Sequence, residues 1–116
     1  MAELFRVTGD HERAASLDRQ AEDLQRRFNE AFWLSSQATY ALRLERGRKP
    51  SSAVASNPGQ TLFTAIVAPE HAQAVLERIL QEDLFCGWGV RTLSAHERAY
   101  NPLDYQTARC GRTTTR

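Results

Sequence analysis

The residues best suited to chemistry gather near the C-terminal end of the chain. Trp88, Arg91, Tyr100, Asn101 and Tyr105 bring ring faces and hydrogen-bond donors together within 18 residues. An aromatic face packs against the C–H side of a sugar ring, while guanidinium and amide groups donate to its hydroxyls. The glycines on both sides of Trp88 let a ligand approach the indole closely. These residues therefore predict a carbohydrate subsite.

A purely structural interpretation of the same stretch stays open, and composition alone favours it. In that interpretation Trp88 and Phe85 fill the core, and Arg91 pairs with an acid such as Glu97. Core aromatics outnumber ligand-binding aromatics in most domains.

Other kinds of site find little support. His11, His71 and His96 lie far apart, without an HxxxH pair or a nearby cysteine partner, so their spacing predicts solvent-exposed histidines and no metal site. Gly87 and Gly89 form a GxG without a third glycine or a following helix. The nucleophile-elbow and P-loop motifs do not occur, and we expect no cofactor.

Length and composition are those of one ordinary domain. The chain has 116 residues, 41% of them hydrophobic and 25% charged, which argues against a two-lobed enzyme and against a membrane protein. No apolar run approaches the ~18 residues that span a bilayer, and charges interrupt the opening residues where a signal peptide is apolar. Two cysteines without CxxC spacing give no disulfide framework, which favours a reducing, cytoplasmic location.

The net charge of the chain is +1, which predicts no nucleic-acid partner and no membrane partner.

The first half of the chain is dominated by one helical pattern. Residues 1–9 are typical of the last turns of a helix that ends at a glycine. From the N-cap Asp10, apolar residues recur at helical spacing for about 23 residues. A weakly alternating segment over 40–45 and the turn after it predict a short β-hairpin with residues 52–55.

The second half begins with two helix starts. Asn57-Pro58 precedes an apolar stripe that extends to Val67, and Pro69 begins a helix that runs to about Gln81. Their short connection predicts a helical hairpin. Residues 84–105 lose the helical period and predict a long aromatic, glycine-rich loop with a short strand at 90–93. The sequence therefore predicts a mainly α fold.

Three strings resemble, in order and spacing, the bacterial amylo-alpha-1,6-glucosidase family of glycogen-debranching-type glycoside hydrolases. They are SNPGQ over 56–60, DLFCGWGVRTLS over 83–94 and YNPLDY over 100–105, and the second is specific. The opening helical segment also resembles the family segment ahead of them. Gln60 stands where the family usually has His, and Cys86 where it has Ser or another small residue.

The resemblance implies a partial domain. The family fold is an (α/α)6 toroid of helical hairpins, and residues 1–105 resemble only a middle piece of it, so we expect uncovered apolar helix faces and poor solubility. The intact relative would bind an α-glucan oligosaccharide or polysaccharide and cleave its α-1,6 branch linkages with a carboxyl acid and a carboxylate base. The resemblance implies that the acid lies upstream of residue 1 and the base downstream of residue 105. No residue here is then expected to be catalytic, and Asp83, Glu97 and Asp104 would form structural ion pairs or order loops.

The segment 106–116 departs from the family pattern, which continues with a string close to HNGSVWPHDN. One set of codons for Gln106 to Thr115, with a single C inserted after its second base, spells that string. Our hypothesis is a one-base deletion after the Tyr105 codon, which makes residues 106–116 an out-of-frame, disordered tail. The segment carries three arginines and no acid.

Two other functions remain open from the sequence. The exposed faces of the helices that begin at Asp10 and Pro69 would suit a small helical protein-interaction module without enzymatic activity. A weaker alternative is that the arginines of residues 106–116 contact nucleic acid or acidic lipid, with affinity that falls steeply with salt.

Overall fold

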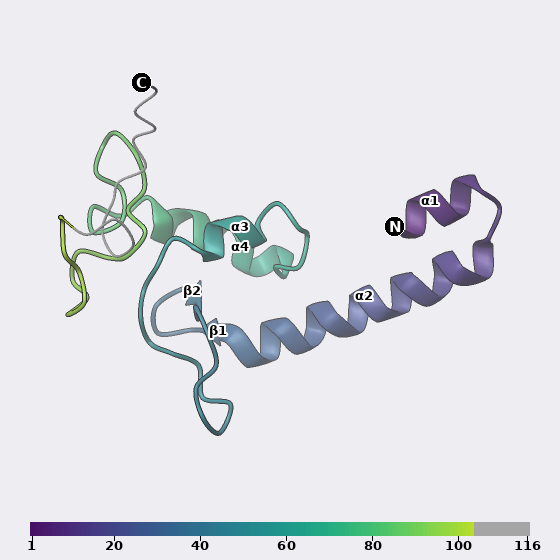
Figure 1. The fold of residues 1–116 in the computed structure, drawn as a ribbon, viewed down its shortest axis with the longest axis horizontal. Coiled ribbons are helices and arrows are strands. Elements are labelled where there is room, and N and C mark those ends of the chain that lie inside the picture. The colour runs from purple at the N-terminus through teal and green to yellow at the C-terminus, as the bar shows by residue number, and fades with distance from the viewer. Residues whose placement is uncertain (104–116) are drawn as a thin grey trace.

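The protein is mainly helical and has one two-stranded antiparallel sheet, which confirms the coarse prediction (Figure 1). The computed structural model describes residues 1–103. In chain order the elements are α1 (Ala2–Val7), α2 (His11–Phe32), β1 (Trp33–Leu34), β2 (Thr39–Tyr40), α3 (Pro58–Thr61) and α4 (Pro69–Ile79).

Helix α2 begins where the sequence predicts and is the longest element. The Asp10 carboxylate accepts a hydrogen bond from the Arg13 backbone N–H at 3.1 Å, which satisfies one of the free donors of the first turn. Asp23 and Arg26 form an ion pair of 2.5 Å on the solvent-exposed face, at a spacing that favours the helix. The helix ends at Phe32, and the next residue, Trp33, has an extended backbone and begins β1.

Helix α1 folds back along α2 and makes the first helical hairpin (Figure 1). The chain reverses at Gly9, whose φ of +83° favours glycine. Arg6 is ion-paired with Asp18 of α2, and the Arg13 guanidinium lies 5.6 Å from the centroid of the Phe5 ring. The predicted helix end over residues 1–9 is confirmed.

The β-hairpin predicted over 40–55 is present in reduced form. Leu44 and Pro50 form one bridge across the turn, and backbone hydrogen bonds flank this bridge on both sides. Residues 52–55 do not pair with 40–45 as predicted, since Ala55 bridges to a later segment. The two-stranded sheet is a second hairpin, which the sequence does not predict, and in it Trp33 of β1 pairs with Tyr40 of β2. The two rings meet at 5.0 Å between centroids, and this contact across the strands stabilises the pair.

The predicted helix between Asn57 and Val67 is largely absent, because α3 has only four residues. Ala65 adopts a φ of +53°, which ends helical geometry before α4 begins. The Gln25 side chain of α2 donates to the Ala65 carbonyl at 2.9 Å and fixes this bend against the long helix. Helix α4 begins at Pro69, as predicted, and ends two residues before the predicted end.

The core lies where α2, β2 and α4 meet. The rings of Phe28 and Tyr40 stack at 4.9 Å between centroids, and Val75 has no exposed surface. The buried cluster consists of Tyr40, Val67, Val75 and Ile79, with partly buried apolar side chains around it.

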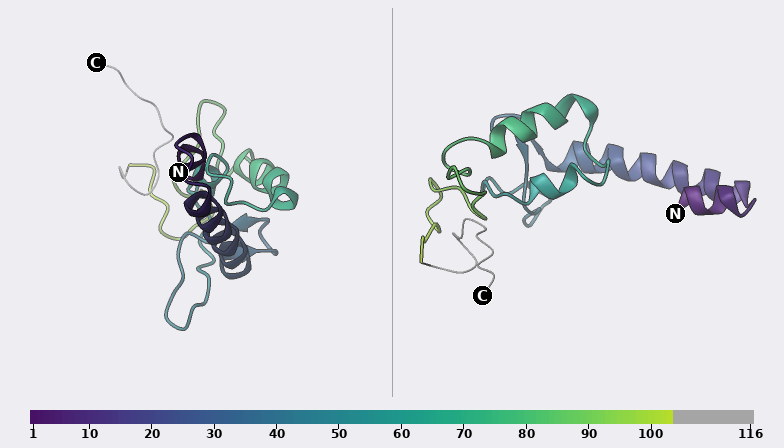
Figure 2. Two further views of the ribbon diagram at one scale, coloured as in Figure 1. Left: turned by 90° about the vertical axis from the view of Figure 1, so that its right-hand side faces the viewer. Right: turned by 90° about the horizontal axis from the view of Figure 1, so that it is seen from above.

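The N-terminal part of α2 extends away from this core together with α1 (Figure 2). The Cα radius of gyration is 17.2 Å, against about 13 Å for a compact chain of this length. Leu24 in the middle of α2 is 55% exposed. The expected uncovered helix face is therefore present. No helix within residues 1–103 is long and apolar enough to cross a membrane.

Candidate functional site

Trp88 stands at the tip of a tight turn and points its indole into solvent. The Cys86 backbone N–H donates to the Gly89 carbonyl at 3.0 Å, and Gly87 takes a φ of +86°, a conformation that side chains disfavour. The indole is 89% exposed. The structural interpretation that placed Trp88 in the core is therefore wrong, because the turn carries the ring away from the apolar cluster.

The stem below this turn is a short irregular hairpin, which we call the Trp88 hairpin (residues 83–95). Phe85 and Val90 form a bridge across it, and the Arg91 N–H donates to the Leu84 carbonyl at 2.7 Å. Leu84 is 1% exposed and anchors the stem, whereas Phe85 is only half-buried. The predicted strand over 90–93 reduces to isolated bridges.

The Arg91 side chain binds backbone carbonyls at the base of the stem. Its Nη1 donates to the Glu82 carbonyl at 2.8 Å and to the Asp83 carbonyl at 3.4 Å. Within residues 1–103 no ion pair joins Arg91 to Glu97, so that expected pairing is wrong. The Glu97 carboxylate instead accepts the Val54 backbone N–H at 2.9 Å.

Asp83 is the buried acid of the site, and it forms the structural ion pair that the sequence favours. Both of its carboxylate oxygens accept from the Arg78 guanidinium at 2.8 Å, and Oδ2 also accepts from the Ser94 hydroxyl. The Arg78 hydrogen bonds lower the pKa of Asp83 to about 2, with a further contribution from Ser94, although burial acts to raise it. Asp83 is therefore ionised at neutral pH and does not serve as a general acid.

Ser94, Asp83 and His96 combine the residue types of a hydrolase triad, but their geometry is different. The Ser94 hydroxyl is 1% exposed and donates to Asp83, while its oxygen accepts the His96 backbone N–H at 3.2 Å. A triad serine instead gives its proton to an imidazole. These hydrogen bonds hold the loop together and do not form a catalytic triad.

The remaining predicted sugar contacts lie further along the chain. The Tyr100 N–H donates to the Glu97 carbonyl at 2.9 Å, and the side chain is half-buried. Asn101 is exposed, and its side-chain oxygen accepts the Leu103 N–H at 3.1 Å. No ring contact joins Trp88 to Tyr100 in the described part of the chain. Asp104 and Tyr105 lie outside the described residues.

His71 departs from the prediction that all three histidines are exposed. Its ring stacks on Trp33 at 3.7 Å between centroids, almost parallel at 3°, and its Nδ1 lies 3.0 Å from the Tyr40 hydroxyl oxygen. Tyr40 donates its proton to the Asn29 side-chain oxygen, and the His71 tautomer that satisfies both contacts is the one with the hydrogen on Nδ1. Burial raises the pKa of Tyr40. His11 and His96 are exposed, as predicted.

The described residues contain no group of three His, Cys, Asp or Glu side chains arranged to hold a metal ion. The stacked Trp33–His71 pair was missed from the sequence because its partners come from different elements. The signal available was Pro69 at the helix start, which places His71 in the first turn of α4.

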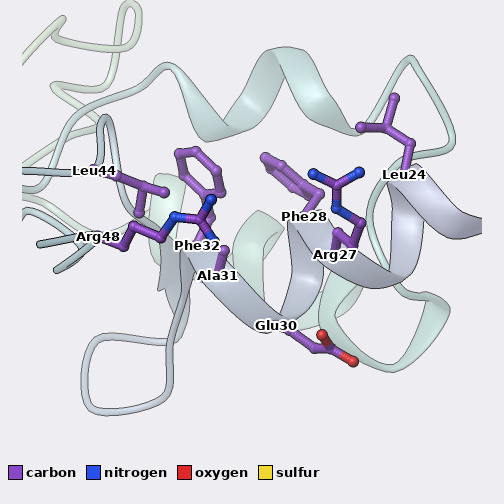
Figure 3. A pocket seen from close by; sticks show the side chains of 8 residues that line it. All are labelled: Leu24, Arg27, Phe28, Glu30, Ala31, Phe32, Leu44 and Arg48. Carbon is purple, nitrogen blue, oxygen red and sulfur yellow. The ribbon is translucent and has the colours of Figure 1, made fainter.

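A separate hollow of about 490 Å³ lies along α2 (Figure 3). The rings of Phe28 and Phe32 point into it from the helix, and the guanidinium groups of Arg27 and Arg48 lie at its rim, while Glu30 points away. Its full lining is Leu24, Arg27, Phe28, Glu30, Ala31, Phe32, Leu44 and Arg48. The hollow offers apolar area and positive charge, and it does not include the Trp88 hairpin.

These features define a class: a helical protein that presents an exposed tryptophan on a turn anchored by a buried ion pair. The family model for amylo-alpha-1,6-glucosidase matches residues 2–115. The chain therefore belongs to the amylo-alpha-1,6-glucosidase family, as its sequence strings indicate. No curated protein matches the chain.

Proposed function

We propose that the chain is part of a glycosidase that acts on the α-1,6 branch linkages of glycogen-like α-glucans. In this proposal it retains part of the sugar-binding surface and lacks the catalytic acid and base. The substrate-binding residues are Trp88, Arg91, Tyr100, Asn101 and Tyr105. The family membership supports the substrate class, because the family is that of amylo-alpha-1,6-glucosidase.

The observation that carries the proposal is the exposure of Trp88. An 89% exposed indole on a turn flanked by glycines offers one face to a flat apolar ligand, which is how aromatic side chains bind the C–H face of a sugar. Arg91, three residues on, is held beside the stem by backbone carbonyls. The proposed subsite thus starts from a ring carried on a turn whose backbone is held by hydrogen bonds.

The proposal that the chain alone does not hydrolyse glucans is supported by the occupation of its local acids. Asp83 is bound to Arg78, and Glu97 accepts a backbone N–H. Inverting hydrolysis needs an acid and a base about 6.5–9.5 Å apart on either side of the bond. In our proposal both lie outside residues 1–105, within an (α/α)6 toroid of which this chain forms one part.

We keep the one-base deletion as a proposal for residues 106–116. It would account for the difference between this segment and the string HNGSVWPHDN, while the match to the family model extends to residue 115. Sequencing the gene would test it: an intact frame relative to other family members, with no base missing after the Tyr105 codon, would remove the idea.

The test of sugar binding is a titration of the purified chain with branched limit dextrin, followed by isothermal titration calorimetry, which does not depend on the tryptophan that is removed. Trp88→Ala removes one indole face of about 80 Å², which at about 25 cal/mol per Å² is about 2 kcal/mol, or roughly thirtyfold in Kd. Phe63→Ala is the matched control, because Phe63 is an 87% exposed aromatic outside the hairpin. Equal affinity of Trp88→Ala and the unchanged chain, or turnover of dextrin by the chain alone, would contradict the proposal.

The second candidate is the helical interaction module, and the exposed apolar side chains of α2 and α4 favour it. Leu24 is 55% exposed, Leu76 44% and Leu80 54%. Under the first proposal the same faces pack against other helices of the toroid. A chain that stays monomeric at high concentration and binds no glucan would favour the module, whereas glucan binding that depends on Trp88 would favour the glycosidase part.

A further inference from the structure

The Trp88 hairpin is closed at its base by one residue. Asp83 accepts two hydrogen bonds from Arg78 of α4 and one from Ser94, so its side chain ties the helix to the far strand of the hairpin. Its backbone carbonyl accepts the Ala95 N–H at 2.9 Å and one contact from Arg91. The side chains of Asp83 and Arg78 are only 5% and 12% exposed.

The pairing between the two arms skips three residues of the far arm, because residues 92–94 pair with residues 54–56 instead. Above Asp83 the Arg91 N–H bonds to Leu84, and the next pair is the Phe85–Val90 bridge. The turn that carries Trp88 closes immediately above that bridge. Because Asp83 directly precedes Leu84 and Phe85, whose pairs with Arg91 and Val90 hold the turn, the placement of the indole depends on the attachment of Asp83 at the base.

We propose that Asp83 is a positioning residue for Trp88, which holds the hairpin on α4 and so sets one orientation of the exposed indole. The ion pair with Arg78 supplies the attachment to the helix, and the Ser94 hydroxyl supplies the attachment across the hairpin. Only the identity of the ligand that Trp88 meets rests on the proposed function. The positioning role itself concerns the order of the hairpin.

The alternative role for a buried ion pair is general stabilisation of the fold, and the two roles differ in what they change. A general loss of stability weakens α2 and the hairpin together. Loss of positioning loosens the hairpin and leaves α2 protected, because Asp83 makes its side-chain contacts with α4 and the hairpin alone among the described residues.

The test uses the full 116-residue chain labelled with ¹⁵N and 5-fluorotryptophan, whose two fluorine signals are assigned with Trp88→Phe. Asp83→Asn removes the charge and keeps the size, and Ser94→Ala removes the bond across the hairpin while it keeps the ion pair. Asp23→Asn is the matched control, because Asp23 is also ion-paired but lies on the exposed face of α2. Amide hydrogen exchange is read at Ala95 and Arg91 in the hairpin and along α2.

We expect Asp83→Asn to accelerate exchange at Ala95 and Arg91 by at least about tenfold, since charge-assisted hydrogen bonds are lost. The Trp88 fluorine signal should change width, and α2 should keep its protection. Ser94→Ala should act in the same direction with a smaller effect, and Asp23→Asn should leave the hairpin unchanged. Unchanged hairpin exchange together with an unchanged Trp88 signal in Asp83→Asn would overturn the proposal.

Two further measurements allow a clear decision in every case. If Asp83→Asn also exposes the amides of α2, Ser94→Ala becomes the deciding variant, and the absence of any hairpin effect there overturns the proposal. A limit-dextrin titration of the same variants separates the two ideas. Failure of the unchanged chain to bind dextrin would count against the proposed function, whereas the exchange and fluorine results judge the role of Asp83 on their own.

Discussion

Asn29 joins α2 to the rest of the chain. The stability lost when its side chain is removed can be worked out from the hydrogen bonds around it. Its side-chain oxygen accepts from the Tyr40 hydroxyl and from the Ala68 N–H at 2.9 Å, and its amide donates to the Ile66 carbonyl at 2.8 Å. Asn29→Ala leaves the Ala68 and Ile66 groups unpaired at about 1 kcal/mol each, and loss of the Tyr40 bond adds about 1 kcal/mol. With a urea m-value of about 1.5 kcal/mol per M, the midpoint should fall by about 2 M.

The assay is urea unfolding followed by the fluorescence of Trp33, which stacks on the same cluster. Tyr40→Phe removes one hydroxyl and should lose only about 1 kcal/mol. Gln20→Ala is the control on the same helix, because Gln20 is exposed and bonds only to Ser16 among the described residues; it should stay within about 0.5 kcal/mol of the unchanged chain. The reasoning fails if Asn29→Ala costs no more than Tyr40→Phe.

Three further predictions concern other parts of the molecule. Acid should weaken the folded chain through Asp83: its pKa lies at about 2 in the folded chain against 3.8 as the ordinary value, so its contribution is complete above pH ~5 and is lost as the pH falls toward 2. The loss should be roughly 2 kcal/mol in urea unfolding, and Asp83→Asn should flatten this part of the profile. Gly59→Ala should destabilise by about 1 kcal/mol in the same assay, because its new Cβ would lie 3.0 Å from the buried Ile79 Cδ1; a stabilised variant would mean that the side chain yields freely. Leu24→Glu should raise the solubility limit, measured by centrifugation, with less than about 0.5 kcal/mol change in stability, and an unchanged limit would show that the exposed α2 face does not drive association.

The sequence predicts best those elements whose signals are local. Asp10 caps α2 with its own carboxylate, and Pro69 starts α4 at the position where a missing N–H costs nothing. Both starts were found because cap and helix lie within one turn of each other.

The sequence fails where the deciding partner is distant. The apolar stripe before Val67 is typical of a helix, yet the bend at Ala65 is held by Gln25 from α2, and the helix is cut short. His71 has no ligand pattern around it, and its burial depends on Trp33, which arrives from the end of another helix. Such contacts form only when α2 and α4 pack together.

The candidate site shows the same division. Residue type predicts Trp88 and Arg91 as sugar contacts, but type alone does not decide between core and surface, since a buried indole and a ligand-binding indole use the same ring. The deciding fact is the turn conformation at Gly87. The anchor at Asp83 needs Arg78, which belongs to the preceding helix and carries no motif of its own.

The two exposed apolar regions of the molecule differ in how they are held, and that difference supports the different partners that we propose for them. Leu24 continues along α2 the apolar row that includes Phe28, whose ring packs into the core, and such a row is typical of a face that meets another helix. Trp88 stands apart from any apolar row, on a turn closed by backbone hydrogen bonds and anchored by a buried ion pair. Burying an indole would contribute about 2 kcal/mol or more, and this turn keeps the ring in solvent. A single exposed ring on a hydrogen-bonded turn suits a flat small ligand, which is why we propose the hairpin as the surface for sugar and α2 as the surface for helix packing.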